Sequence, residues 1–94
     1  MTDYEIMYVM RPEQGIVEDV ILKFNNLIAS NGGVVENTER WGERRMPYAI
    51  QGYENGIYIL VTFRAGKKCV LELHKAMDIT EEVLRHMIIR KGVC

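Results

Sequence analysis

The sequence predicts a single α+β domain whose secondary-structure elements follow the order β-α-β-β-α-β. Its 94 residues, 48% of them hydrophobic, suit one modest core and leave no room for a second, so residues 1–94 are expected to form one domain. Two segments repeat apolar residues at three- and four-residue spacing, as amphipathic helices do. Four other segments have the composition of strands, clearest in the β-branched and aromatic run IYILVTF.

The first strand is predicted over residues 4–10, which have the sequence YEIMYVM. Side chains alternate between the two faces of a strand, so Ile6 and Tyr8 fall on one face and Met7 and Val9 on the other. Whichever face meets the core, the opposite face is therefore largely apolar as well.

A helix is predicted over residues 13–30, because its apolar residues recur at helical spacing and the sequence NGG supplies a C-terminal cap after it. A long strand is predicted over residues 34–50. Its middle is polar, Gly42 suggests a bulge, and Pro47 cannot donate a ladder hydrogen bond. These features indicate an edge strand.

Residues 51–56, QGYENG, are predicted to form a turn, with the Asn-Gly pair as its strongest signal. The strand over residues 57–63 is apolar on both faces and is therefore expected to be central. A helix over residues 67–77 and a last strand over residues 81–91 complete the chain. With right-handed crossovers, this order predicts a ferredoxin-like fold: a four-stranded antiparallel sheet with both helices on one face.

Two helices leave the other face of such a sheet open. The first and third strands form the central pair of this topology, so Met7, Val9, Tyr58 and Leu60 are expected to form a contiguous apolar patch there. A contiguous patch usually marks an interaction site, although single exposed apolar residues are ordinary. We therefore expect a partner to bind this face.

The sequence predicts no enzyme, cofactor or metal site. His74 and His86 have no Cys or acidic neighbour at ligand spacing, and Cys69 and Cys94 fit neither a metal motif nor a disulfide framework. Phosphate-binding glycine loops are missing from the sequence. An RNA-recognition motif is only loosely matched, since Tyr58 alone could stack a base on the open face.

No apolar run approaches the roughly 20 residues that span a bilayer, and the N-terminus lacks the features of a signal peptide. A cytoplasmic protein without membrane contact is therefore expected. The net charge of −1 argues against a polycation that coats nucleic acid. Basic residues nevertheless collect at 40–45, 64–68 and 85–91, where they are either solvated surface charges or local phosphate-binding patches.

Trp41 to Ile50 have the sequence WGERRMPYAI, which resembles the signature of the bacterial small-subunit ribosomal protein six family. Signature positions are occupied by Gly42, Arg44, Arg45, Tyr48 and Ile50, whereas Met46 and Pro47 stand where Leu and Ala or Ser are usual. The N-terminal Tyr-Glu-Ile, the NGG after the first helix and the tail VLRHMIIR extend the resemblance over essentially the whole chain.

The resemblance implies a non-catalytic structural component of the small ribosomal subunit. Members of that family bind small-subunit (16S) ribosomal RNA cooperatively with ribosomal protein eighteen in the platform. A near-neutral chain fits this role, because a basic partner would supply part of the positive charge.

On this interpretation we expect two sets of site residues. The RNA-binding candidates are Arg44, Arg45, Arg85, Arg90 and Lys91. The partner-binding candidates are Met7, Val9, Trp41, Tyr58 and Leu60. The alternative is a stand-alone ferredoxin-like module that dimerises through its open face or senses a ligand. The isolated chain should be a monomer on the first interpretation and a tight dimer on the alternative.

Overall fold

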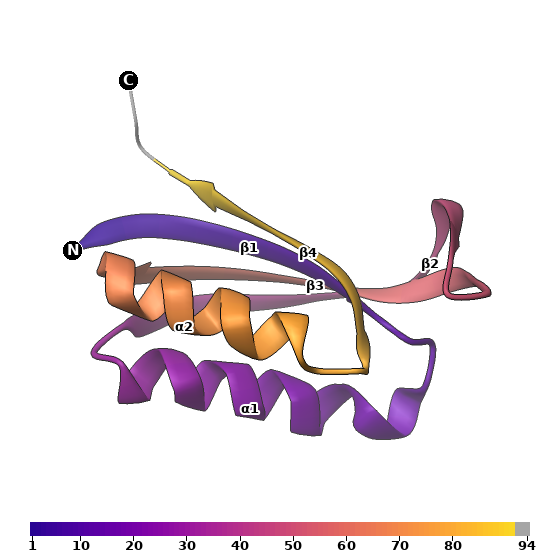
Figure 1. Ribbon diagram of the computed structural model, residues 1–94, viewed down its shortest axis with the longest axis horizontal. Coiled ribbons are helices and arrows are strands. Elements are labelled where there is room, and N and C mark those ends of the chain that lie inside the picture. Colours follow the sequence, from indigo (N-terminus) through magenta and orange to yellow (C-terminus); the bar gives the residue numbers. More distant parts are fainter. Residues whose placement is uncertain (92–94) are drawn as a thin grey trace.

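The computed structural model describes residues 1–91, and Cys94 lies outside the described residues (Figure 1). Four strands and two helices follow the predicted order, with one short 3-10 helix at Gln14–Ile16 before the first α-helix. Their bounds are β1 Thr2–Met10, α1 Val17–Ser30, β2 Val34–Ile50, β3 Tyr53–Ala65, α2 Lys67–Asp78 and β4 Val83–Arg90.

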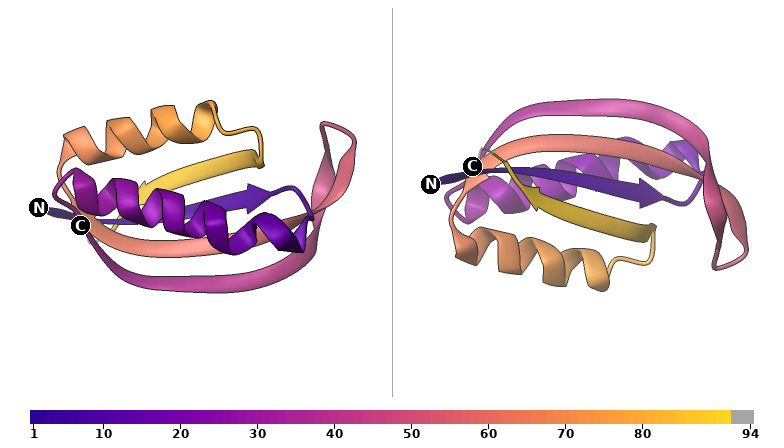
Figure 2. Two further views of the ribbon diagram at one scale, coloured as in Figure 1. Left: turned by 90° about the horizontal axis from the view of Figure 1, so that it is seen from below. Right: turned by 90° about the horizontal axis from the view of Figure 1, so that it is seen from above.

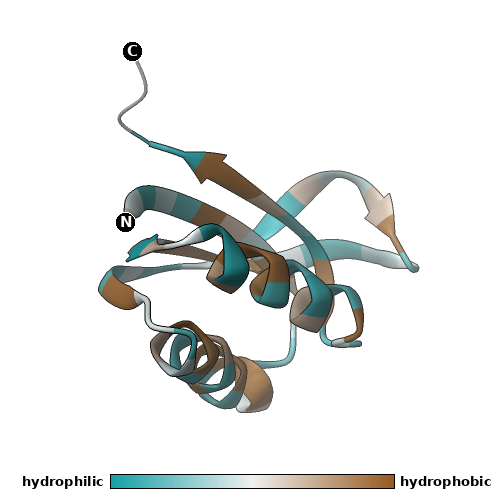
Figure 3. Cartoon of the chain, turned by 60° about the vertical axis from the view of Figure 1, so that its left-hand side comes forward, coloured by the Kyte–Doolittle hydropathy of each residue, from teal (hydrophilic) through white to brown (hydrophobic). Residues whose placement is uncertain are grey.

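The four strands form one antiparallel sheet in the order β2-β3-β1-β4, and both helices lie against the same face (Figure 2). The predicted ferredoxin-like architecture is therefore confirmed. β1 and β3 are central, as expected from the topology and from the apolar composition of residues 57–63, while β2 and β4 form the two edges. β4 is apolar along much of its length (Figure 3).

The main core lies between the sheet and the helices. Ile6 and Tyr8 of β1 and Phe63 of β3 are almost completely buried there, and they meet Phe24 of α1 and Leu73 of α2. The rings of Tyr8 and Phe24 pack edge to face with centroids 5.4 Å apart, a favoured aromatic geometry. This burial determines which side chains of the sheet point away from the helices.

The turn predicted over residues 51–56 is wrong in extent. Only Gln51 and Gly52 turn, with φ of 51° and 84°, and Ile50 pairs directly with Tyr53. Positive φ at both central residues is typical of a two-residue type I′ hairpin turn, which matches the twist of the strands. The Asn-Gly pair lies inside β3 instead.

Pro47 lies where the β2–β3 ladder breaks, between the pairs Arg45↔Asn55 and Ile50↔Tyr53. This is consistent with its missing backbone donor. A second ladder shift, between Arg40 and Gly42, marks a bulge at Trp41, and Gly42 adopts a φ of 82°. The bulge expected near Gly42 is therefore present.

Candidate partner and nucleic-acid interfaces

The open face carries apolar side chains from three adjacent strands. Met7 of β1 lies opposite Leu60 of β3 and Met87 of β4, and all three point away from the helices because their strand neighbours fill the main core. Met87 and Ile89 are 49% and 48% exposed. Sequence reasoning missed these two residues, although apolar residues at consecutive positions of the last strand signalled two apolar faces.

Val9 lies on this face and lines its groove, but it is almost completely covered, whereas an exposed side chain was expected. It is only 2% exposed and forms a second apolar cluster with Met46 and Leu84, flanked by Tyr53 and Tyr58. The end of the β2–β3 hairpin rises away from the helices (Figure 1), which brings Met46 over Val9. Val9 therefore supports the open face from beneath.

A groove of about 230 Å³ runs between the raised hairpin and β4, and its lining is mainly apolar. Met7, Pro47, Tyr58 and Met87 are among its walls. Arg85 bounds it and donates a long hydrogen bond from Nη1 to the Tyr48 hydroxyl, at 3.5 Å. The guanidinium carbon also lies 6.0 Å from the Tyr48 ring centroid, within the range of a cation–π contact.

Trp41 is exposed on edge strand β2, and its indole Nε1 donates to Glu39 at 3.4 Å. Glu39 lies opposite Leu60, so this contact belongs to the open face. The Arg44 guanidinium carbon lies 5.5 Å from the Trp41 ring centroid. Arg44 is therefore held against Trp41, whereas Arg45 is exposed opposite Asn55.

The five RNA-binding candidates do not form one patch. Arg85 pairs across from Val9 and Arg90 from Tyr4, which separates them by five residues, or about 17 Å along the strand. They also point to opposite faces, since Tyr4 packs against the main core and Val9 does not. Arg85 and Arg90 therefore lie toward different ends of β4 and on different faces of the sheet.

The two histidines, which are separate in the sequence, meet in the structure. His74 Nδ1 lies 3.0 Å from His86 Nε2, and an Asp78 carboxylate oxygen lies 3.8 Å from the same His86 nitrogen. Burial and the neighbouring His74 lower the pKa of His86. No group of three metal-ligating side chains suited to an ion occurs within residues 1–91. The pair therefore joins α2 to β4, a proximity that sequence spacing did not indicate.

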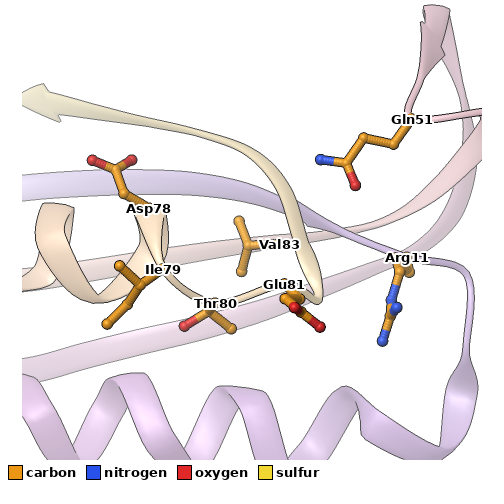
Figure 4. Close-up of a pocket in the computed structure, with 7 residues that line it drawn as sticks. All are labelled: Arg11, Gln51, Asp78, Ile79, Thr80, Glu81 and Val83. Carbon is orange, nitrogen blue, oxygen red and sulfur yellow. The ribbon is translucent and has the colours of Figure 1, made fainter.

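Neither a polar hollow near the hairpin turn nor the buried Cys69 thiol has the arrangement that catalysis requires. A cavity of about 350 Å³ near the hairpin turn is lined by Arg11, Asp78 and Glu81, among others, and the Asp78 carboxylate points away from that of Glu81 (Figure 4). Arg11 is already ion-paired with Glu13 at 2.9 Å. Burial raises the pKa of the Cys69 thiol, which disfavours the reactive thiolate.

None of the helices within residues 1–91 has the length and apolar character needed to cross a membrane.

Comparison with known proteins gives a consistent result. Residues 3–90 match the family model described as ribosomal protein S6. The chain is 37% identical over 94 residues to small ribosomal subunit protein bS6 of Desulforamulus reducens, and the match covers 98% of this chain and 99% of the relative. It is 39% identical over 92 residues to the bS6 protein of Thermoanaerobacter pseudethanolicus, covering 96% of this chain and 97% of the relative.

A solved structure supports the same family as the family model and the two relatives. The crystal structure of 30S ribosomal protein S6 from Thermotoga maritima has a TM-score of 0.90 and 25% identity to this chain, covering 96% of it and 87% of the relative. The family model spans nearly the whole described chain, so the expectations of a non-enzymatic protein and of a cytoplasmic, ribosomal location are confirmed. The chain belongs to the ribosomal protein S6 family, the bS6 proteins of the small ribosomal subunit.

Proposed function

We propose that this chain binds small-subunit (16S) ribosomal RNA cooperatively with ribosomal protein eighteen in the platform of the small subunit. The observation that carries the proposal is the open sheet face, which the helices leave uncovered. It combines exposed Met87 and Ile89 with the apolar groove beside the raised hairpin. An exposed apolar face of this kind suits a protein partner better than a phosphate backbone.

The rim of this face carries the residue types that dominate binding energy at protein interfaces. Trp41 stacks with Arg44 on one side, and Arg85 contacts Tyr48 on the other. Trp, Tyr and Arg are enriched among interface hot spots. We infer that the partner inserts an apolar segment between these two pairs, where Met7, Tyr58 and Leu60 form the floor.

The charge of the chain favours cooperative over independent RNA binding. A net charge of −1 provides little general attraction to RNA, whose binding depends strongly on neutralised phosphates. A basic partner docked on the open face would add the missing cations. The isolated chain is expected to be a monomer, and dimerisation through the open face is the competing outcome.

The proposal is tested by titrating a platform fragment of the RNA with the chain, with ribosomal protein eighteen, and with both, at two salt concentrations. Tight, salt-dependent binding is expected only when both proteins are present. Met87→Glu should abolish the cooperativity because it places a charge in the apolar face. Leu22→Glu is the matched control, because Leu22 is exposed on α1, away from that face, and it should have no effect.

Equal binding by Met87→Glu and the original chain would contradict docking through the open face. Absence of binding in every combination, with the chain running as a stable dimer in light scattering, would instead favour the self-associating alternative.

A further inference from the structure

The fold brings together two of the three basic stretches of the sequence. β1 pairs Thr2 with Ala65 and Tyr4 with Arg90, and the Lys91 backbone nitrogen donates to the Asp3 carbonyl at 2.8 Å. α2 begins directly after β3, so its first turn lies at the same end as the N-terminus and the end of β4 (Figure 1). The basic end, as we name it, comprises Arg64, Lys67, Lys68, Arg90 and Lys91.

Three of these cations have no carboxylate partner in the fold. Arg64 pairs with Asp3 at 2.9 Å, and Lys91 approaches Glu5 at 3.9 Å. Within residues 1–91, no carboxylate lies at ion-pairing distance from Lys67, Lys68 or Arg90, and all three are exposed. Their charge is therefore available to an external anion.

Helix stability does not account for Lys67 and Lys68. They occupy the first turn of α2, which contains no acidic residue, whereas Lys75 lies in the last turn. The helix dipole favours carboxylates in the first turn and cations in the last. Only Lys75 is electrostatically matched to its place in the helix, so the two N-terminal lysines require another explanation.

The three unpaired cations share one side of the molecule. Arg90 lies opposite Tyr4, whose ring stacks on Phe63 with centroids 5.7 Å apart on the helix side of the sheet. Arg90 therefore points to the side on which α2 presents Lys67 and Lys68. The apolar groove opens on the other side of the sheet, so a ligand at these cations would leave the groove accessible.

We propose that Lys67, Lys68 and Arg90 contact the phosphate backbone of the RNA, while the open face holds the protein partner. This inference rests on the proposed function and specifies which side of the chain meets the RNA. It assigns the main phosphate contacts to the basic end, and not to Arg44 and Arg85, which already stack on Trp41 and Tyr48. Arg64 and Lys91 are not part of this assignment, because Asp3 and Glu5 on the open-face side of β1 already pair with them.

The test measures how RNA affinity changes with salt for the triple variant Lys67→Gln/Lys68→Gln/Arg90→Gln, with ribosomal protein eighteen present. Each lost phosphate contact reduces the slope of log affinity against log salt by about one unit, so a reduction of about three is expected. Lys75→Gln removes the same charge from the other end of α2 and should leave the slope unchanged. Lys67→Arg/Lys68→Arg keeps the charge and should retain the original slope.

The outcomes separate this inference from the proposed function. An unchanged slope in the triple variant, while the original chain still binds RNA cooperatively, would overturn the inference and leave the proposed function standing. The inference would also be overturned if the triple variant no longer bound ribosomal protein eighteen when RNA is absent. The basic end would then be a surface that docks the protein partner. If the original chain bound no RNA in any combination, both would fall. Thermal unfolding of each variant controls for folding.

Discussion

Substitution of Gly56 by alanine tests the arrangement of the raised hairpin. A Cβ at Gly56 would lie 2.3 Å from Val9 Cγ1 and 3.1 Å from the Met10 carbonyl oxygen. Carbon atoms pack at about 3.5–4.0 Å, so the Val9 methyl would have to move by more than about 1 Å. Overpacking of this kind costs about 1–3 kcal/mol of unfolding free energy. Without the clash, Gly→Ala would stabilise the protein by about 0.4–1 kcal/mol, so the two cases differ in sign.

Val9→Ala should relieve the clash, because it removes the methyl that the new Cβ would meet. Alone it costs about 1.6 kcal/mol from two buried methyl groups, plus a cavity term. The double variant should therefore lose about 1–2 kcal/mol less than the sum of the single changes. Urea unfolding measures all four proteins. Gly15→Ala serves as control, since nothing lies within 4 Å of a Cβ there.

Additive effects, or a stabilising Gly56→Ala, would refute this reasoning. Val9 would then not lie beneath the hairpin, and the residues described as lining the groove beside it would be wrong.

Three further changes test other parts of the fold by thermal or urea unfolding. Stability should fall as the pH drops through about 6.5, because the lowered pKa of His86 lets the unfolded chain bind the proton first; His86→Gln should flatten this part of the profile. Tyr8→Phe should be neutral or stabilise by about 1 kcal/mol, since the Tyr8 hydroxyl is buried with no hydrogen-bond partner among residues 1–91. Gln51→Asn should stabilise by up to about 1 kcal/mol, because Asn tolerates positive φ better.

Each of these has a distinct contrary result. Unchanged pH dependence in His86→Gln would mean that another group titrates in this range. A clear loss of stability in Tyr8→Phe would indicate that the hydroxyl has a partner, such as a buried water. Destabilisation by Gln51→Asn would contradict the turn geometry.

Local patterns were sufficient to predict most of the fold. Helical spacing and the NGG cap located α1, and the bounds of β2 agree with the predicted residues 34–50. The extent of the turn was predicted wrongly because Asn55-Gly56 has the composition of a hairpin turn but lies inside β3. In the structure, position 56 requires a glycine because Val9 packs so closely that a Cβ would clash with it. A local signal cannot distinguish a glycine needed for φ from one needed for space.

The candidate site depends on contacts between residues that are far apart in the chain, and these contacts are harder to predict from the sequence. Alternation along β1 and β3 correctly placed Met7, Tyr58 and Leu60 on the open face. It could not reveal that the hairpin end covers Val9, because that contact joins residues far apart in the chain. The meeting of His74 with His86 likewise follows from tertiary packing alone.

The most direct test of the account is amide chemical-shift mapping of the isotope-labelled chain in the complex with ribosomal protein eighteen and the RNA fragment. The partner should perturb the open-face residues Met7, Leu60 and Met87, and the RNA should perturb Lys67 and Lys68. This result would support two separate binding surfaces on this chain. RNA-dependent shifts confined to the open face, with the basic end unchanged, would contradict the account.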